Sequence, residues 1–199
     1  MEPLNTELLV ILIAICTYFF AAIPFGLIFA KVAGLGDLRN IGSGNIGATN
    51  VLRTGNKKVA ALTLIFDSLK GVAAVLLSRH FIPGHEYTIG FLAIFAHIFP
   101  VYLKFKGGKG VATTLGVYFA WEPMLGAAVL ITWLLSAKLF KISSVSAIIA
   151  ATLAPVFVYL LKIDSAIIPF TALISATLFY THRDNIRRLV NKQESLISE

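Results

Sequence analysis

Long apolar runs restrict what this chain can fold into more than any other feature of its sequence. They cover Leu8–Phe29, Val59–Leu77, Ile89–Leu103, Met124–Leu135, Val145–Leu161 and Ala166–Leu178. About 20 mostly apolar residues in a helix cross the hydrocarbon core of a bilayer. Only 14% of the residues are charged, against about 25% in soluble domains, which is too few to cover a water-soluble globule. We therefore expect an all-α, multi-span membrane helix bundle, and the composition excludes soluble nucleases, Rossmann enzymes and disulfide-stabilised secreted domains.

The breaks between the apolar runs predict about seven transmembrane helices. We place them at residues 8–30, 59–78, 87–103, 110–121, 123–140, 144–161 and 165–181. The fourth is too short for a full straight span, so it is expected to be short, tilted or broken. Five spans with a re-entrant element over 110–140 are the alternative. Seven spans leave only about 60 residues for loops, so residues 1–199 should form a single membrane domain without a soluble catalytic part.

Positive charge gathers on one side of the predicted membrane. That side carries Lys31, Arg39, Arg53, Lys57, Lys58, Lys104, Lys106, Lys109, Lys138, Lys141, Arg183, Arg187, Arg188 and Lys192, which are 14 of the 17 Lys and Arg residues. The positive-inside rule makes this side cytoplasmic, with the N-terminus outside and the C-terminus inside. Anionic phospholipids explain the net charge of +7. Because the basic residues lie in membrane-edge loops without a nucleic-acid-binding module, we expect no nucleic-acid partner.

The first loop on the basic side, residues 36–55, is rich in groups that bind phosphate. Gly42, Gly44 and Gly47 can take positive φ at little cost, which lets backbone amides converge on an anion. Its candidate phosphate ligands are Ser43, Gly44, Asn45, Thr49, Asn50 and Arg53. A flexible connector is the alternative interpretation, but a connector does not require arginines flanking so many polar side chains.

The second basic loop contains Gly107-Gly108-Lys109-Gly110 and leads into Thr113. It lacks the spacing of a nucleotide-binding Walker loop, because Gly110 follows Lys109. We interpret it as a tight glycine turn that carries Lys109 and opens a helix, whose N-terminal amides favour anions. Lys104 and Lys106 are explained as anchors of the span ends.

The end of the last predicted span places His182, Arg183 and Asn185 on the same side of the membrane. His182 is a candidate base, acid or phosphate ligand, and a polar anchor is the simpler alternative. Ser143 and Ser144 at the start of the sixth span are candidate helix caps or further phosphate donors.

Two charges lie inside the second predicted span. Asp67 and Lys70 are three residues apart and share a helix face. Charged groups in a span are costly and usually face a partner or a polar interior. They are therefore either an ion pair that joins helices or part of the site, and the sequence leaves both open.

Signatures of metal-dependent or covalent catalysis are missing. The sequence has no His-x4-Asp, no Gly-x-Ser-x-Gly and no Cys/His cluster, and its one cysteine, Cys16, lies in the first span, where a thiol is a poor nucleophile. Any chemistry is thus expected to need no metal, no cofactor and no covalent enzyme intermediate.

Three segments together resemble the cytoplasmic motifs of the bacterial acyl-phosphate:glycerol-3-phosphate acyltransferases. They are residues 42–53, 106–113 and 182–189. The Ile23-Pro24-Phe25-Gly26, Asp67-x-x-Lys70-Gly71 and Ser143-Ser144 segments also fit the pattern. The chain departs from it in the tail, where Lys192-Gln193-Glu194 stands in place of Gly, any residue and Glu.

The resemblance implies an integral inner-membrane enzyme with a cytoplasmic active site. Such an enzyme transfers a fatty acyl group from acyl phosphate to the sn-1 hydroxyl of glycerol-3-phosphate, giving lysophosphatidic acid and inorganic phosphate. This is the first acylation in phospholipid synthesis. The implied partners are both substrates, membrane lipids and a separate soluble phosphate acyltransferase that supplies acyl phosphate.

With this resemblance we assign roles to the residues of the three loops. The expected catalytic residues are Arg53, Lys109, His182 and Asn185. The expected substrate-binding residues are Ser43, Gly44, Asn45, Thr49, Asn50, Gly107, Gly108, Gly110, Thr113, Ser143, Ser144 and Arg183. The general base is either His182 or a substrate phosphate. A transporter or channel for a phosphorylated metabolite is the main alternative, although no inverted repeat is found, and a non-enzymatic lipid-binding scaffold is a weaker one.

Overall fold

The computed structural model describes residues 5–197. Within them the regular secondary structure is helical, and there is no β-strand. The helices are α1 (Thr6–Ala21), α2 (Phe25–Val32), α3 (Ala48–Leu52), α4 (Lys57–Phe81), α5 (Glu86–Ile98), α6 (Val111–Trp121), α7 (Pro123–Phe140), α8 (Ser143–Leu160), α9 (Ile168–Thr181) and α10 (Arg183–Val190). Short 3-10 turns cover Leu38–Asn40, Val101–Leu103 and Ser165–Ile167. The predicted all-α class is confirmed.

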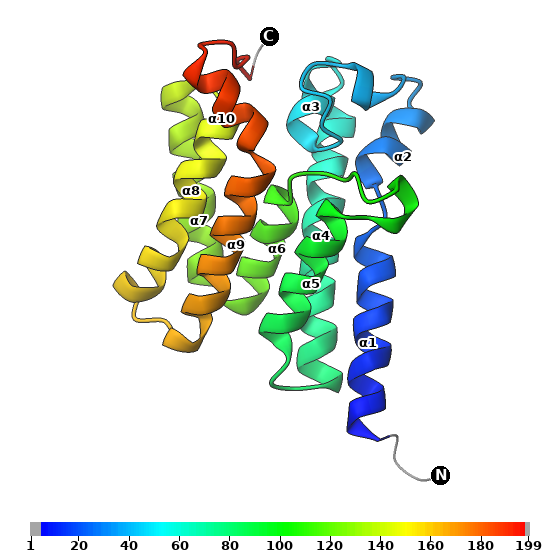
Figure 1. Ribbon diagram of the computed structural model, residues 1–199, viewed down its shortest axis with the longest axis vertical. Helices are drawn as coiled ribbons and strands as arrows, with labels where there is room; N and C mark the ends of the chain where they lie inside the picture. The colour runs from blue at the N-terminus through cyan, green and yellow to red at the C-terminus, as the bar shows by residue number, and fades with distance from the viewer. Residues whose placement is uncertain (1–4, 198–199) are drawn as a thin grey trace.

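The long helices run side by side along one axis of the molecule (Figure 1). Segments Thr6–Val32, Lys57–Phe81, Glu86–Leu103, Pro123–Phe140 and Ser143–Leu160 are long and apolar enough to cross a membrane. A sixth crossing results if Ser165–Thr181 and Arg183–Val190, bent by 58°, are counted as one. The multi-span character is thus confirmed, while seven crossings and the N-out, C-in orientation stay predictions.

One end of the bundle carries most of the polar loops. Residues 33–56, residues 104–110, the turn at 141–142 and α10 all lie at the end where the C-terminus is found (Figure 1). We call this the loop end. The opposite end carries the short connections between α4 and α5 and between α6 and α7.

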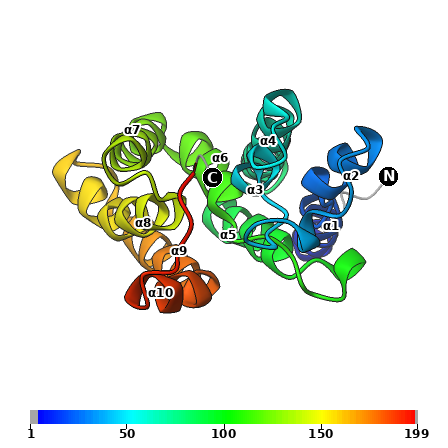
Figure 2. The same ribbon diagram turned by 90° about the horizontal axis from the view of Figure 1, so that it is seen from above.

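The weakest predicted span corresponds to α6, which has only 11 residues. It lies at the centre of the bundle, between the group formed by α1, α4 and α5 and the group formed by α7, α8 and α9 (Figure 2). Glu122 ends α6 and accepts a hydrogen bond from the Met124 amide at the start of α7. The short helix is therefore an internal element of the bundle, and the loop before it reaches the middle of the loop end.

Glycines allow α4 and α6 to pack backbone against backbone. A Cβ atom at Gly116 would collide with the Ser68 carbonyl oxygen, and one at Gly71 with the Thr113 carbonyl oxygen. Small residues at such crossings permit the close approach on which helix packing in membranes depends. This contact fixes α6, and the loop before it, against α4.

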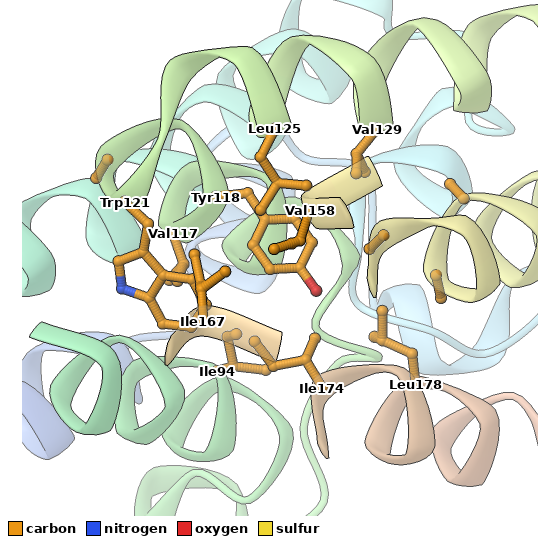
Figure 3. Close-up of a cluster of buried hydrophobic side chains, with 14 of the residues drawn as sticks. Ile94, Val117, Tyr118, Trp121, Leu125, Val129, Val158, Ile167, Ile174 and Leu178 are labelled. Carbon is orange, nitrogen blue, oxygen red and sulfur yellow. The ribbon is translucent and has the colours of Figure 1, made fainter. Parts of the chain in front are cut away.

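A buried apolar cluster lies below the loop end. Figure 3 shows side chains from α5 to α9 that meet around the ring of Tyr118. The labelled members are Ile94, Val117, Tyr118, Trp121, Leu125, Val129, Val158, Ile167, Ile174 and Leu178. Large apolar side chains such as Leu135, Leu139 and Tyr159 remain exposed on the outer surface, as expected where lipid replaces water.

Candidate functional site

A cavity of about 370 Å³ opens among the helices at the loop end. Its mouth is polar and is lined by Ser43, Asn45, Thr49, Arg53, Lys109, Ser143, Ser144, His182, Asn185 and Glu194. Its interior is mostly apolar and is lined by Ala60, Ala61, Leu64, Leu115, Val129, Leu130, Leu134, Ala147, Ala150 and Ala151, with Asp67 and His97 as polar exceptions. Tyr118 joins the cavity to the apolar cluster below it. This combination suits a ligand with an anionic head and an apolar chain.

Two helices begin at the cavity. Gly110, with φ of 88°, precedes the first residue of α6, and α8 begins at Ser143 without a side-chain cap. Gly110, Val111, Ser143 and Ser144 all line the cavity. Because the first amides of a helix have no partner within it and its dipole is positive there, both helix starts favour a bound anion.

Lys109 supplies a positive charge at the mouth. Burial lowers the pKa of its ammonium group from the usual 10.5 to about 8. The Glu194 carboxylate opposes this shift, whereas the positive charges of Arg188 and Arg53 add to it. Lys109 is thus mostly charged at neutral pH, yet close enough to titration for pH to matter.

Arg53, like Lys57, also lines the cavity. Its Nη2 donates a hydrogen bond of 3.0 Å to the Leu196 carbonyl oxygen in the tail. Its buried Nε has no hydrogen-bond partner among the described residues. The guanidinium therefore keeps an unused donor beside the cavity.

His182 is buried where α9 ends, and one contact assigns a proton to its Nδ1 while its low pKa keeps the ring neutral. The ring Nδ1 lies 2.7 Å from the Leu178 carbonyl oxygen. Since a carbonyl can only accept, Nδ1 carries the proton and the neutral ring leaves Nε2 free as an acceptor. Burial first, and then the charge of Lys109, lower the pKa of His182 to about 4.

The tail returns to the cavity and brings Glu194 into it. The Glu194 carboxylate accepts hydrogen bonds from Ser144 Oγ at 2.7 Å, from the Asn185 amide and from Arg188 Nε at 2.6 Å. Burial raises the pKa of Glu194, but these hydrogen bonds outweigh it and hold the pKa below its usual value.

Sequence reasoning gave Glu194 and Arg188 no role. The available signal was that the tail keeps the glutamate of the family pattern, even though lysine replaces the glycine before it. Lys192 adopts φ of 57°, the left-handed conformation that glycine takes most easily. Lys192 thus forms the turn that brings Glu194 to the cavity.

Asn50 organises the first loop. Its Nδ2 donates to the carbonyl oxygens of Leu38, Ile41 and Asn45 at 2.7–3.0 Å, and its Oδ1 accepts from the Ser43 amide at 3.0 Å. These contacts occupy the side chain of Asn50, although the residue also lines the cavity. Its direct effect is therefore to hold the loop in place.

Other residues of the first loop then reach the cavity. Ser43 and Asn45 line it, and Thr49 Oγ1 lies 3.2 Å from Ser143 Oγ at the start of α8. Gly42 and Gly44 adopt positive φ as the sequence predicts, whereas Gly47 has φ of −83°. The glycine conformations thus agree with the prediction at two of these positions and differ at Gly47.

Five predicted substrate-binding residues do not line the cavity: Gly44, Gly107, Gly108, Thr113 and Arg183. Gly44 turns the first loop with φ of 70°. Gly107 and Gly108 pack against the end of α5, and Thr113 is fully buried on the α4 side of α6. Arg183 is exposed, stacks over the Tyr180 ring and donates to the Tyr180 carbonyl oxygen at 3.0 Å. These residues shape the surroundings, and the other predicted residues meet at the cavity.

The two charges within α4 form a buried ion pair, and each of the two residues lines a different cavity. Lys70 Nζ lies 2.9 Å from Asp67 Oδ1, and both side chains are at most 3% exposed. Asp67 lines the cavity, whereas Lys70 lines a second, apolar cavity of about 350 Å³ and donates to the Ile23 carbonyl oxygen at 3.2 Å. The pair thus both joins helices and reaches the cavity wall.

Over residues 5–197, no group of three or more His, Cys, Asp or Glu side chains is arranged to hold a metal ion. The hydrogen-bond donors that gather at the cavity are amides, hydroxyls, an imidazole and cations, which suit phosphate, and the carboxylates of Asp67 and Glu194 also line it.

Comparison with known proteins gives a consistent result. Residues 11–192 match the family model described as glycerol-3-phosphate acyltransferase. The glycerol-3-phosphate acyltransferase of Brucella canis is 50% identical over 182 residues, covering 90% of this chain and 89% of that protein. The crystal structure of PlsY (YgiH), an integral membrane glycerol 3-phosphate acyltransferase, in its glycerol 3-phosphate form has a TM-score of 0.87 and 35% identity over 94% of each chain. Its lysophosphatidic acid form has a TM-score of 0.82 and 32% identity over 94% of each chain.

Proposed function

The chain belongs to the glycerol-3-phosphate acyltransferase family, and on this premise we propose that it transfers a fatty acyl group from acyl phosphate to the sn-1 hydroxyl of glycerol-3-phosphate. The products are lysophosphatidic acid and inorganic phosphate. The cavity carries this proposal, because its polar mouth and apolar interior match a donor with a phosphate head and an acyl chain.

The anionic groups of both substrates have matching partners at the mouth. Lys109, Arg53 and the starts of α6 and α8 supply positive charge and free amides. Such donors stabilise charge most when they are held in place before the reaction, because they need no reorganisation during it. We assign Lys109 and the amides at the start of α6 to the departing phosphate.

The proposed reaction is a single displacement at the acyl carbon. The sn-1 oxygen forms the new ester bond, the bond between the acyl carbon and the bridging phosphate oxygen breaks, and the hydroxyl proton ends on the released phosphate. Phosphate is already a good leaving group, so no side chain has to be acylated. The chain then contributes positioning and charge stabilisation.

In this proposal the proton passes to a substrate phosphate. The second pKa of a phosphate monoester is about 6, whereas that of His182 is about 4. The phosphate is therefore the stronger base, and His182 Nε2 is suited to accept a hydrogen bond from the sn-1 hydroxyl. Asn185, held by Glu194, would orient the same substrate.

The proposed location is the bacterial inner membrane, with the loop end facing the cytoplasm. The basic residues at this end support that orientation. A soluble phosphate acyltransferase would deliver acyl phosphate from the cytoplasmic side, and the cavity would receive its chain from the bilayer.

The reaction is tested with purified protein in lipid nanodiscs, palmitoyl phosphate and glycerol-3-phosphate, by following phosphate release. We expect release that requires both substrates, is lost in Lys109→Ala and is retained in Lys106→Ala, because Lys106 is exposed and does not line the cavity. No release from folded protein, with flux of glycerol-3-phosphate into liposomes instead, would overturn the enzyme proposal in favour of a transporter.

His182→Ala then separates the two candidate bases. We expect a raised KM for glycerol-3-phosphate with a smaller change in kcat, because His182 orients this substrate. A loss confined to kcat, with unchanged substrate binding, would make His182 the base.

A further inference from the structure

His97, to which the proposed reaction gives no role, lines the cavity where α4, α5 and the loop before α6 meet. It belongs to the last turn of α5 and is 5% exposed. On one side, its Nδ1 lies 3.7 Å from Asp67 Oδ1 on α4. On the other side, its ring lies against the backbone of Gly108, one residue before Lys109.

The contact between His97 and Gly108 leaves no room for a side chain. A Cβ atom at Gly108 would overlap His97 Nε2 and lie 2.9 Å from Cε1. The Gly108 amide also donates to the His97 carbonyl oxygen at 3.1 Å, and the Gly107 amide donates to the Ile98 carbonyl oxygen at 3.0 Å. The imidazole and the backbone of α5 together fix the position of this loop relative to the end of α5.

Asp67 lies beside the other side of the imidazole and is itself anchored. Lys70 Nζ lies 2.9 Å from its Oδ1 and donates to the Ile23 carbonyl oxygen between α1 and α2. Buried charges within a membrane are costly and are kept in place by their partners. The ion pair therefore ties the first helix break to α4 and places the Asp67 carboxylate 3.7 Å from His97 Nδ1.

We propose that Asp67 and His97 are positioning residues that set the loop Gly107–Gly110 and thereby the place of Lys109 and the start of α6. This inference rests on the function proposed above. The far side of the loop is fixed by Thr181 Oγ1, which donates to the Lys109 carbonyl oxygen at 3.1 Å. Catalytic groups are sensitive to such support, because a misplacement of about 1 Å can reduce a rate about 100-fold.

The test introduces a steric clash at Gly108 and then removes the clashing side chain of His97. Gly108→Ala places a methyl group on the His97 ring and should lower kcat/KM at least about tenfold. His97→Ala removes the ring that supports the loop and should also lower it. In the double variant the methyl group occupies part of the space left by the ring, so its kcat/KM should exceed that of Gly108→Ala.

Gly107→Ala is the matched control. A Cβ atom there would collide with the His97 carbonyl oxygen, with Pro100 and with the Ile98 carbonyl oxygen. His97→Ala leaves all of these atoms in place, so it should not rescue Gly107→Ala. Asp67→Asn removes the carboxylate charge beside His97 and should lower kcat/KM; it also leaves the buried Lys70 ammonium group without its charged partner, so its unfolding temperature should fall as well.

Inorganic phosphate provides a readout that does not depend on acyl transfer. The stabilisation of each variant by phosphate is measured as the shift in its unfolding temperature, and it should follow the same order as kcat/KM. Rescue of Gly108→Ala in either readout, but not of Gly107→Ala, supports the proposal. Equal rescue of both, no rescue of Gly108→Ala, or wild-type behaviour of His97→Ala overturns it. If the wild-type protein shows no acyl transfer, the proposed function is refuted but this inference is not. The phosphate-induced shifts in unfolding temperature still decide whether His97 positions the loop.

Discussion

The pKa of Lys109 leads to a quantitative prediction about pH. The pKa of about 8 belongs to the substrate-free protein, and kcat/KM reports the ionisations of the free enzyme. Lys109 gains a proton below this pKa and loses it above, so the active, charged form disappears as the pH rises. About 90% is charged at pH 7 and about 10% at pH 9, which predicts an approximately tenfold fall in kcat/KM.

The assay is phosphate release under limiting glycerol-3-phosphate between pH 6.5 and 9.5, with spontaneous hydrolysis of acyl phosphate subtracted. In Lys109→Arg the fall above pH 8 should vanish, because arginine stays charged throughout this range. Lys106→Arg is the matched control and should keep the wild-type profile. Glu194→Gln should move the fall to lower pH, because the carboxylate raises the pKa of Lys109. A flat wild-type profile, or a fall that persists in Lys109→Arg, would refute the reasoning.

Three further predictions concern packing and specificity. Gly116→Ala should destabilise the protein by roughly 1–3 kcal/mol, because its Cβ meets the Ser68 carbonyl oxygen; an unchanged unfolding temperature in detergent would contradict the close α4–α6 contact. Tyr118→Ala should shift the kcat/KM preference towards longer acyl phosphates, because the ring separates the cavity it lines from the apolar cluster to which it belongs; an unchanged preference would place the acyl chain elsewhere. Arg183→Ala should keep kcat/KM within about twofold of the wild type, as expected for an exposed residue outside a site, and a tenfold loss would show that Arg183 reaches substrate.

The membrane bundle and the chemistry of the site could be predicted from local sequence. Runs of apolar residues determine helical spans because backbone groups in lipid must be paired within the segment. Glycine-rich loops with Lys109 and Arg53 indicate anion binding because amides and cations are suited to phosphate wherever they lie. The short α6 was also expected, because Glu122-Pro123 ends its apolar run early.

The assembly of the site depended on the tertiary structure. Arg183 and His182 are neighbours in the sequence, yet the bend between α9 and α10 buries one and exposes the other. The family pattern points to Glu194, but only the fold pairs it with Ser144, 50 residues away.

The two levels differ because residue type fixes what a side chain can bind, whereas packing fixes what it meets. The sequence alone determined that this protein is helical, lies in a membrane and carries anion-binding loops, since each property follows from short-range composition. The tertiary structure decided that Asp67 touches the cavity and His97 touches Gly108, since these contacts arise only where α4, α5 and α6 come together.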